Sequence, residues 1–365
     1  MIIASPPRPD TRPDRRPTRR RLAGVALAAT VLVALAACAA PAASTGTGTS
    51  GTGTSGTGAA ADPAGAGYTT PRTMPDGKGS GQPDGVFPRT VVHFAGTTTI
   101  PAAPQRVAVI STGQADSLLT LGIVPVASTA ADGAAVVPDY LTRAFPEDAD
   151  ALSAVAPLGD RISPDIESVA AAKPDLILMN VTGKDAASLY ASLSAIAPTV
   201  ATQGTGLYWK QDLLLLADAV GRTQQAASWL DSYQSDAAAF GAGLAERPAV
   251  SFLRSSADRI RVFGVASFAG SVAEDAGLPR PQAQDFTDQT SRDISEEQID
   301  LAEGDHVFAG VQGGDEKALT GLPLWPTLQA VEDDAVTFVD DDVFYLNTGP
   351  TAARSVLEAM RSALG

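Results

Sequence analysis

The sequence predicts an α/β protein in which two lobes with mostly parallel central sheets are joined by one long, rigid α-helix. The helix is indicated between Thr223 and Ala245, where apolar residues recur at alternating steps of four and three, as on one helical face. Two lobes are indicated by a repeated pattern, E-x-V-x5-D-x-I from Glu167 and E-x-I-x5-D-x-V from Glu297. Identical spacing on both sides of a bridge favours two similar units.

The N-terminus has the order of a secretory signal. An arginine-rich start leads into an apolar run over 22–37, which closes on Leu-Ala-Ala before Cys38, the only cysteine. The run is short for a membrane-spanning helix. We therefore interpret residues 1–37 as a signal peptide, and the Leu-Ala-Ala-Cys sequence resembles the lipobox of bacterial lipoproteins, in which Cys38 would carry the lipid.

A flexible tether is predicted over residues 38–88. Residues 44–58 are almost only Gly, Thr and Ser, and Pro- and Gly-rich sequence follows to about residue 85. This composition cannot bury a core.

The first lobe is predicted over 89–222, where short apolar runs alternate with helical patterns, as in sheets that are mostly parallel. The helix at 165–172 begins near Pro164 and is ended by Lys173-Pro174. The expected strands are 90–94, 97–100, 106–110, 124–127, 175–179 and 199–201, and the expected helices are 114–121, 165–172, 184–196 and 211–220.

The bridging helix is predicted over 223–246, with Thr223 as its N-cap and Arg247-Pro248 as its end. About 22 residues at about 1.5 Å each give a rod of about 33 Å. The second lobe follows over 247–365. Its expected strands are 249–254, 260–263, 306–309 and 336–339, and its expected helices are 271–276, 295–301, 326–330 and 350–364.

Charge and composition exclude several functions. Without the seven Arg and two Asp of residues 1–37, the chain keeps 19 basic and 39 acidic residues, a formal charge of −20, which disfavours nucleic acid as a partner. An enzyme is the main rival class, but the chain has two histidines, His93 and His306, and no G-x-S-x-G elbow. Two distant histidines do not supply a zinc or manganese site, so no direct metal site is expected.

Several long stretches resemble the extracytoplasmic binding proteins of iron-siderophore and cobalamin ABC importers. They are PQRVAVISTGQADSLLTLGIVPVAST, IESVAAAKPDLILM, ISEEQIDLAEGDHVF and WPTLQAVEDDAVTFVDDDVFYL, collinear from about Thr90 to the C-terminus. The resemblance implies the class III periplasmic-binding-protein fold, a ligand in the cleft between the lobes, no cofactor and no catalysis. It also implies a monomer on the extracytoplasmic face of a bacterial cell membrane, anchored by lipid on Cys38.

The resemblance implies roles for charged residues. Glu167 and Glu297 match the acidic positions that contact basic residues of the permease dimer, although a glutamate in a first helical turn also complements the helix dipole. Arg161 matches the place from which hydroxamate-siderophore binders send an arginine to the iron-bound oxygens. Arg254, at the carboxyl end of a strand, is the second candidate, because that end opens towards the cleft.

Aromatic residues are candidates for the cleft walls, since they offer a bulky chelate apolar contact with a polar tip. Core packing is an equal alternative for Trp325, which lies between prolines. Asn180 stands where some hydroxamate binders place an aromatic. The predicted walls are Trp209, Phe268, Trp325 and Tyr345, with Tyr208 and Asn347 as weaker candidates.

The expected ligand is a ferric siderophore, so that iron enters already chelated. A neutral or cationic ferric hydroxamate suits the acidic protein best, because a ferric catecholate needs a denser basic cluster than Arg161, Arg254 and Lys210 promise. Haem, with Tyr208 or Tyr345 as axial ligand, and cobalamin remain alternatives on the same scaffold. A lipoprotein that binds siderophore for signalling is a further alternative.

Overall fold

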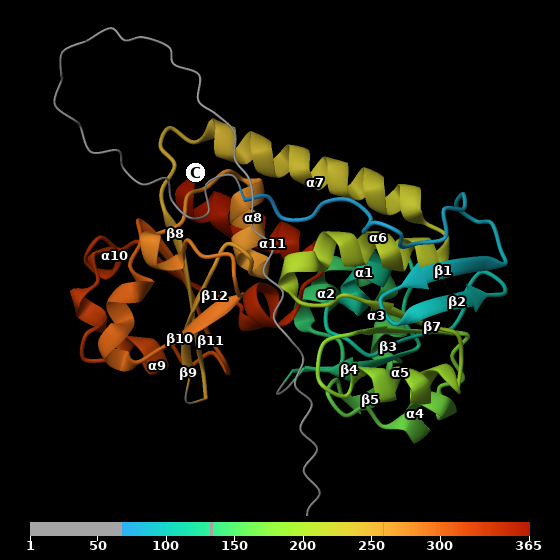
Figure 1. Cartoon of the computed structure of the whole chain (residues 1–365). Helices are drawn as coiled ribbons and strands as arrows, with labels where there is room; N and C mark the ends of the chain where they lie inside the picture. Colours follow the sequence, from blue (N-terminus) through green and yellow to red (C-terminus); the bar gives the residue numbers. More distant parts are fainter. Residues whose placement is uncertain (1–67, 132–133, 258) are drawn as a thin grey trace, which may run out of the picture. The chain divides into compact units, whose positions relative to one another are not determined.

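The computed structural model describes residues 68–131, 134–257 and 259–365, which belong to one compact unit, Ala60–Gly365. The predicted signal peptide (1–37), Cys38 and most of the predicted tether lie outside the described residues. The described part has the predicted α/β architecture, with two lobes and one long helix, α7, that runs along both (Figure 1).

Lobe one contains a five-stranded, fully parallel sheet in the order β5-β4-β3-β6-β7. The separate hairpin β1–β2 is antiparallel. The strands are β1 (Arg89–His93), β2 (Gly96–Ile100), β3 (Val107–Val109), β4 (Ala127–Ala130), β5 (Ala156–Asp160), β6 (Leu176–Asn180) and β7 (Thr199–Thr202). The helices are α1 (Gln114–Thr120), α2 (Asp139–Ala144), η1 (Pro146–Asp148), α3 (Ala149–Ser153), α4 (Ile166–Ala171), α5 (Ala186–Ser194), η2 (Gly206–Tyr208) and α6 (Trp209–Val220).

Lobe two contains a five-stranded sheet in the order β10-β9-β8-β11-β12, in which β9 is antiparallel to both neighbours. The strands are β8 (Val250–Ser256), β9 (Arg259–Phe263), β10 (Ser291–Ile294), β11 (His306–Val311) and β12 (Val336–Val339). The helices are α8 (Phe268–Asp275), η3 (Gln282–Gln284), η4 (Glu296–Ala302), α9 (Lys317–Thr320), η5 (Trp325–Thr327), α10 (Gln329–Glu332), the π-helix η6 (Asp342–Leu346) and α11 (Pro350–Leu364).

The predicted repeat is visible in the sheets. β3, β6 and β7 of lobe one occupy the same places as β8, β11 and β12 of lobe two. The repeated aspartates also act alike: the Asp175 carboxylate accepts the backbone N–H groups of Gln105 (2.8 Å) and Arg106 (2.9 Å), just before β3. The Asp305 carboxylate accepts the N–H of Ala249 (2.7 Å), just before β8. Each therefore fixes the start of the strand beside its own.

The bridging helix α7 covers Thr223–Gly243, close to the predicted range. Its apolar stripe is buried: Ala226, Leu230, Tyr233, Ala237 and Phe240 are at most 8% exposed. The predicted N-cap is wrong. Thr223 is the first helical residue, and its N–H is accepted by the Asp84 carboxylate at 2.7 Å, as is that of Gln224 at 3.0 Å.

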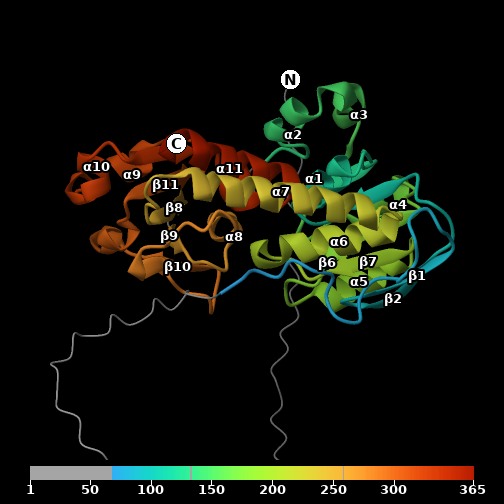
Figure 2. The ribbon, with the colours of Figure 1, turned by 90° about the horizontal axis from the view of Figure 1, so that it is seen from above.

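Asp84 belongs to a segment that the sequence assigned to the flexible tether. In the structure this segment, the strap (residues 68–88), is ordered against both lobes, alongside α6 and α7 (Figure 2). On lobe two, the Thr70 hydroxyl and the Arg72 guanidinium donate to Glu274 of α8 at 2.8 and 2.9 Å. On lobe one, the Ser80 hydroxyl donates to Asp218 of α6 at 2.7 Å. The predicted tether boundary at residue 88 is therefore wrong, because polar contacts, together with the packing of Met74 and Phe87 against the core, hold this segment.

Two further differences concern sheet edges. β5 (sequence APLGD) and β10 (sequence SRDI) are edge strands that the sequence did not reveal, because edge strands tolerate proline, glycine and exposed charge. β4 begins at Ala127 and ends at Ala130, later than the predicted 124–127. Among the described residues, no helix is long and apolar enough to cross a membrane.

Candidate ligand-binding cleft

The carboxyl ends of the lobe-one strands surround a cavity of about 290 Å³. Arg161 follows β5 directly, and its side chain lines the cavity together with Lys184, from the loop after β6. Asn180, the last residue of β6, lines the same cavity and accepts the N–H of Thr182 at 3.1 Å. Both cationic side chains are exposed. The structure thus places Arg161 where a strand end opens to solvent, and its contact with a chelate stays a prediction.

The corresponding ends of lobe two carry arginines. Arg254 lies near the end of β8 and is 6% exposed. Its guanidinium donates two hydrogen bonds to the carboxylate of Asp341, which follows β12: Nε to Oδ1 at 2.6 Å and Nη2 to Oδ2 at 2.7 Å. The facing strand β9 brings Arg261 beside it, opposite Arg254 in the ladder. Arg261 is half-buried and donates to the Ser256 hydroxyl at 3.3 Å. Burial, with the positive charges of Arg254 and Arg259, lowers the pKa of Arg261.

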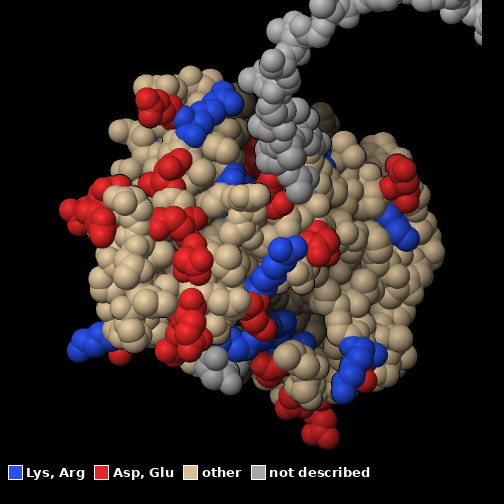
Figure 3. All heavy atoms as spheres, turned by 60° about the vertical axis from the view of Figure 1, so that its left-hand side comes forward, with Lys and Arg blue, Asp and Glu red and all other residues tan. Residues whose placement is uncertain are grey.

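The floor between the two sets of strand ends is formed by one loop from each lobe. Ser111 lines the lobe-one cavity and also a smaller hollow that it shares with Asn347 of lobe two. A Cβ on Gly113 would lie 2.8 Å from the Thr348 hydroxyl oxygen, so the loops touch here. Through Ser111, the lobe-one cavity thus adjoins the loop of lobe two that carries Asn347 and Thr348. Figure 3 shows a hollow on this side of the molecule with basic side chains at its wall.

Three of the four predicted aromatic walls are buried packing residues, which corrects that prediction. Trp209 is 2% exposed, packs edge-on against Tyr233 and Phe268, and donates its indole N–H to Ser271 at 3.0 Å. Phe268 itself is 5% exposed under the bridging helix. Trp325 is 5% exposed in the lobe-two core, the alternative left open from its sequence.

Tyr345 is the aromatic candidate closest to the cleft. Its ring is half-buried, 4.8 Å from that of Phe263, and its hydroxyl donates to the Phe308 carbonyl at 2.9 Å. Burial raises its pKa, so a tyrosinate ligand for haem is disfavoured. Of the weaker candidates, Asn347 lines the floor, whereas the hydroxyl group of Tyr208 lies near Tyr68 of the strap, whose pKa it helps to raise.

Glu167 and Glu297 occupy matching places in the two lobes. Each lies in the first turn of a short helix, α4 or η4, and each is exposed. Neither glutamate caps its helix, since the Asp165 carboxylate caps α4 and a Ser295–Gln298 capping box closes η4. Helix capping therefore does not require either carboxylate.

The lobes are joined at their base by buried polar contacts. The Lys210 ammonium of α6 and the Asp275 carboxylate of α8 lie 2.6 Å apart, both side chains fully buried, and the Tyr233 hydroxyl of α7 donates to Asp275 at 3.1 Å. Lys210 therefore holds the two lobes together. The sequence had left it open as a basic residue for the ligand, and its burial in this ion pair excludes that role. Burial lowers the pKa of Lys210 and raises that of Asp275, so desolvation offsets part of their attraction.

A second contact joins α1 to the C-terminal helix. The buried Asp116 carboxylate accepts the N–H groups of Thr351 (2.9 Å) and Ala352 (3.0 Å) in the first turn of α11. The Tyr140 hydroxyl donates to the same carboxylate at 3.2 Å. Burial raises the pKa of Asp116. Together with Lys210 and Asp275, this contact fixes the lobes at their base and leaves the strand ends accessible.

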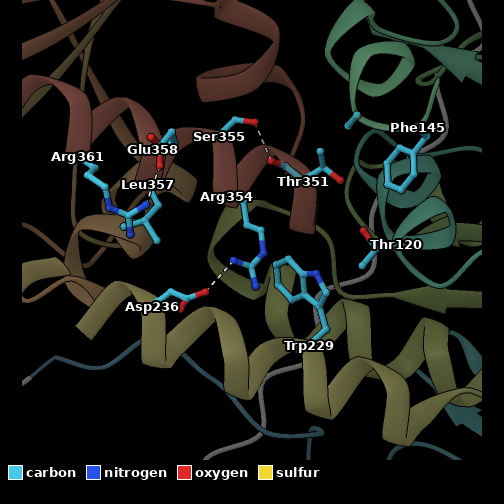
Figure 4. A pocket seen from close by; sticks show the side chains of 11 residues that line it. Thr120, Phe145, Trp229, Asp236, Thr351, Arg354, Ser355, Leu357, Glu358 and Arg361 are labelled. Carbon is cyan, nitrogen blue, oxygen red and sulfur yellow. Dashed lines mark hydrogen bonds and ion pairs between the residues drawn. The ribbon is translucent and has the colours of Figure 1, made fainter. Parts of the chain in front are cut away.

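A larger cavity lies elsewhere in the described part of the chain. It measures about 680 Å³ and lies between α7, α11 and the end of α2 (Figure 4). Its arginines already have partners: Arg354 pairs with Asp236 at 2.9 Å and lies over the Trp229 ring, and Arg361 pairs with Glu358 at 2.6 Å. With its charges satisfied and none of the predicted residues at its wall, this cavity is a poor candidate for the ligand site.

Direct metal binding has no visible basis in the described part of the chain. No group of three His, Cys, Asp or Glu side chains that could hold a metal ion occurs there. His93 bonds Thr98 at 2.9 Å, and His306 bonds Thr337 at 2.8 Å, in separate lobes. Burial, with the charge of Lys78, lowers the pKa of His93 to about 4.

Sequence reasoning missed Lys184 and Ile162, which line the lobe-one cavity, and Arg261, which lies opposite Arg254 on β9. Lys184 and Ile162 lie in loops. Loop residues follow no helical or strand periodicity, so the sequence does not show which way their side chains point. Arg261 lies in an alternating strand, in which an arginine resembles an ordinary solvent-facing residue. Its pairing opposite Arg254 could have been suspected from the short Ser256-Ala257-Asp258 turn between the two predicted strands.

Comparisons with known proteins agree with this architecture. A sequence profile described as "Periplasmic binding protein" matches residues 107–343. The probable siderophore-binding lipoprotein YfiY of Bacillus subtilis is 29% identical over 290 residues, 74% of this chain and 86% of the relative. The Fe(3+) dicitrate-binding periplasmic protein FecB of Escherichia coli is 26% identical over 276 residues, 74% and 88% of the two chains. The structure of Staphylococcus aureus SirA complexed with staphyloferrin B has a TM-score of 0.65 at 24% identity, covering 75% of this chain and 98% of SirA.

Proposed function

Because the chain belongs to the periplasmic binding protein family, we propose that it captures a ferric siderophore outside the cytoplasm and delivers it to an ABC importer. The observation that carries this proposal is the cleft: Arg161 and Lys184 on lobe one and Arg254 and Arg261 on lobe two, with a shared floor. Guanidinium groups suit the clustered oxygens of a ferric chelate. The relatives support the ligand class, since YfiY is named as siderophore-binding and FecB as Fe(3+) dicitrate-binding.

The family consists of substrate-binding proteins. We therefore propose that the chain binds its ligand without catalysing a reaction. Iron enters in this proposal as part of the ligand, so the protein needs no resident cofactor. The preference for a hydroxamate chelate rested on the place of Arg161 in the resemblance and on the net charge of the whole chain. It stays a prediction, which the local charges of the cleft oppose.

The test of the function is direct binding. The full chain, purified in detergent, is titrated with ferric siderophores. Bound chelate is measured as the visible absorbance that a size filter retains together with the protein. Native mass spectrometry gives the number of chelates per chain. One chelate per chain is expected. Arg161→Ala should weaken the binding of the retained chelate ten- to a hundredfold while leaving the melting temperature unchanged, since loss of a charge-assisted contact costs about 1.5–3 kcal/mol. Retention of no ferric chelate at micromolar concentration would refute the proposal.

We further propose that the protein is held on the extracytoplasmic face of the cell membrane by lipid on Cys38. The support is the Leu-Ala-Ala-Cys sequence after an apolar run and the long Gly/Ser/Thr-rich segment that follows. Cys38→Ala should release the protein from membranes or leave it unprocessed. Unchanged fractionation together with unchanged mature mass would contradict the anchor.

The proposed partner is a permease dimer that contacts Glu167 on lobe one and Glu297 on lobe two. Both side chains are exposed, and helix capping does not use them. A single copy of the binding protein presents both lobes to such a dimer, so we propose that it acts as a monomer.

A further inference from the structure

We propose that the ligand is a ferric chelate with net negative charge, and that Arg261 is the lobe-two residue that selects for this charge. The inference rests on the proposed function and names its substrate class. It reverses the expectation of a neutral or cationic chelate, which followed from the acidic composition of the whole chain. The local arrangement of charges in the cleft carries the argument.

On lobe two, the arginines differ in what already holds them. Asp341 occupies both the Nε and Nη2 positions of Arg254, so that its charge is largely neutralised within the protein. Arg259 is exposed and paired with Asp293 at 2.8 Å. Arg261 lies opposite Arg254 on β8 and opposite Asp293 on β10, but Asp293 pairs with Arg259, and no carboxylate in the described ranges comes within ion-pair distance of Arg261. Arg261 is therefore the cation of this wall that an incoming anion can neutralise.

The hydrogen-bonding state of Arg261 leads to the same conclusion. One of its nitrogens donates to Ser256 at a long 3.3 Å, and its Nε is buried with no partner among the described residues. A buried donor without an acceptor is costly, and costlier when it carries charge. The guanidinium also lies 5.5 Å from the centre of the Phe263 ring, which keeps it on the β9 surface. An anionic oxygen at this position would satisfy both the charge and the donor.

Lobe one presents a matching set of charges. Arg161 and Lys184 both line its cavity, with Asp185 as the acidic residue of the lining, so this wall carries a net positive charge. Neither cation has a carboxylate within ion-pair distance in the part of the chain that the structure describes. Beside them, Ile162 is 74% exposed, which offers apolar surface to the organic part of a chelate. A positive wall on each side of the cleft favours a negatively charged ligand over a cationic one.

The experiment compares three ferric chelates on the full chain in detergent. Ferric dicitrate supplies carboxylates, ferric enterobactin supplies catecholates, and ferrioxamine B is a cationic hydroxamate. We expect at least one of the two anionic chelates to bind ten times more tightly than ferrioxamine B or better. Whichever of the two anionic chelates binds more tightly shows whether the cleft prefers carboxylate or catecholate oxygens.

Two matched variants test the role of Arg261. Arg261→Gln should weaken binding of the anionic chelate ten- to a hundredfold and leave ferrioxamine B unaffected. Arg292→Gln removes the same charge from an exposed arginine of the neighbouring strand β10, which Asp288 pairs at 3.1 Å, and should change binding by less than threefold. Melting temperatures of both variants check that the fold is kept.

The outcomes separate the two proposals. Tightest binding of ferrioxamine B would overturn the anionic class and keep the siderophore function. Equal effects of Arg261→Gln and Arg292→Gln on the anionic chelate would overturn the role of Arg261. If none of the three chelates binds, both the anionic ligand class and the proposed siderophore-binding function are refuted.

Discussion

At the scale of single residues, the placement of carboxylates decides which cations remain available to a ligand. Asp341 neutralises Arg254, whereas Arg261 on the neighbouring strand has only a hydroxyl partner among the described residues. Two arginines of similar sequence context thus differ in what they can do. In the proposed cleft, Arg254 would therefore offer a ligand less unpaired charge than Arg261.

His93 gives a prediction about pH. Its imidazole is buried, bonded to Thr98, and has a pKa of about 4 in the folded protein, against about 6.5 in an unfolded chain. Between these values the unfolded chain binds more protons, so this group should lower stability as pH falls from about 6.5 to about 4, by up to about 3 kcal/mol. His93→Gln should make that fall in melting temperature shallower.

The measurement is a series of thermal melts from pH 7 to pH 4 on the wild type and the variant. The many carboxylates contribute equally to both proteins, so the difference between the two curves isolates His93. Parallel curves over this range would show that the buried imidazole does not titrate as expected. His306, whose pKa burial also lowers, provides the comparison variant His306→Gln.

The candidate site was predictable where strand ends could be located. Arg254 ends the predicted strand 249–254, whereas Arg161, which lines the lobe-one cavity, follows β5, a strand that the sequence did not reveal, and was identified by the resemblance alone. The aromatic walls were wrong because an aromatic near a strand end has the same sequence signature whether it faces ligand or packs under a helix. Trp209 and Phe268 pack under α7, which no local pattern reveals.

At the scale of secondary structure, the cap of α7 gives the next prediction. Asp84 lies far from Thr223 in sequence but accepts the first two helical N–H groups. Asp84→Ala should lower the free energy of unfolding by about 1 kcal/mol, or roughly 2 °C in melting temperature. Asp231→Ala, at an exposed position on α7, is the control and should change stability by less than about 0.5 kcal/mol. A smaller effect of Asp84→Ala than of the control would show that water caps the helix equally well.

The elements that sequence analysis found are those with a strong apolar period. The bridging helix, β6 and β11 are buried and were predicted within a few residues. The edge strands β5 and β10 and the strap carry mostly polar residues, and tertiary contacts alone order them. A composition rich in glycine and proline cannot distinguish a free tether from a strap that specific carboxylates hold.

At the scale of the molecule, the base of the lobes should be sensitive to loss of charge. Lys210→Met leaves Asp275 buried with Arg72 as its remaining cation, at 3.0 Å. Breaking one side of a buried pair costs about 3–5 kcal/mol, whereas replacing both sides with apolar residues is far cheaper. Urea unfolding should therefore show a large loss for Lys210→Met and partial recovery in Lys210→Met with Asp275→Leu. A loss below about 1 kcal/mol in the single variant would mean that solvent reaches the pair.

The docking proposal is tested at the same scale. Glu167→Ala with Glu297→Ala should retain the melting temperature and siderophore affinity, because both side chains are exposed and outside the cleft. Uptake and stimulation of transporter ATP hydrolysis should be lost, since truncating one side of an interfacial charge pair costs about 2–5 kcal/mol, more than a helix-dipole effect. The matched control is Asp300→Ala, which removes an exposed carboxylate from the same helix η4 and should leave transport unchanged. Normal transport by the double variant would refute the docking role.

The strap also determines how the protein would carry mechanical load. A pull on the chain ahead of residue 68 first meets Thr70 and Arg72, which hold it to α8, and then Ser80 and Asp84, which hold it to α6 and α7. These contacts lie at the base where the lobes are joined. Tension at the N-terminus would thus be absorbed in shear along the bridge, and the strand ends that form the cleft would stay mechanically unloaded.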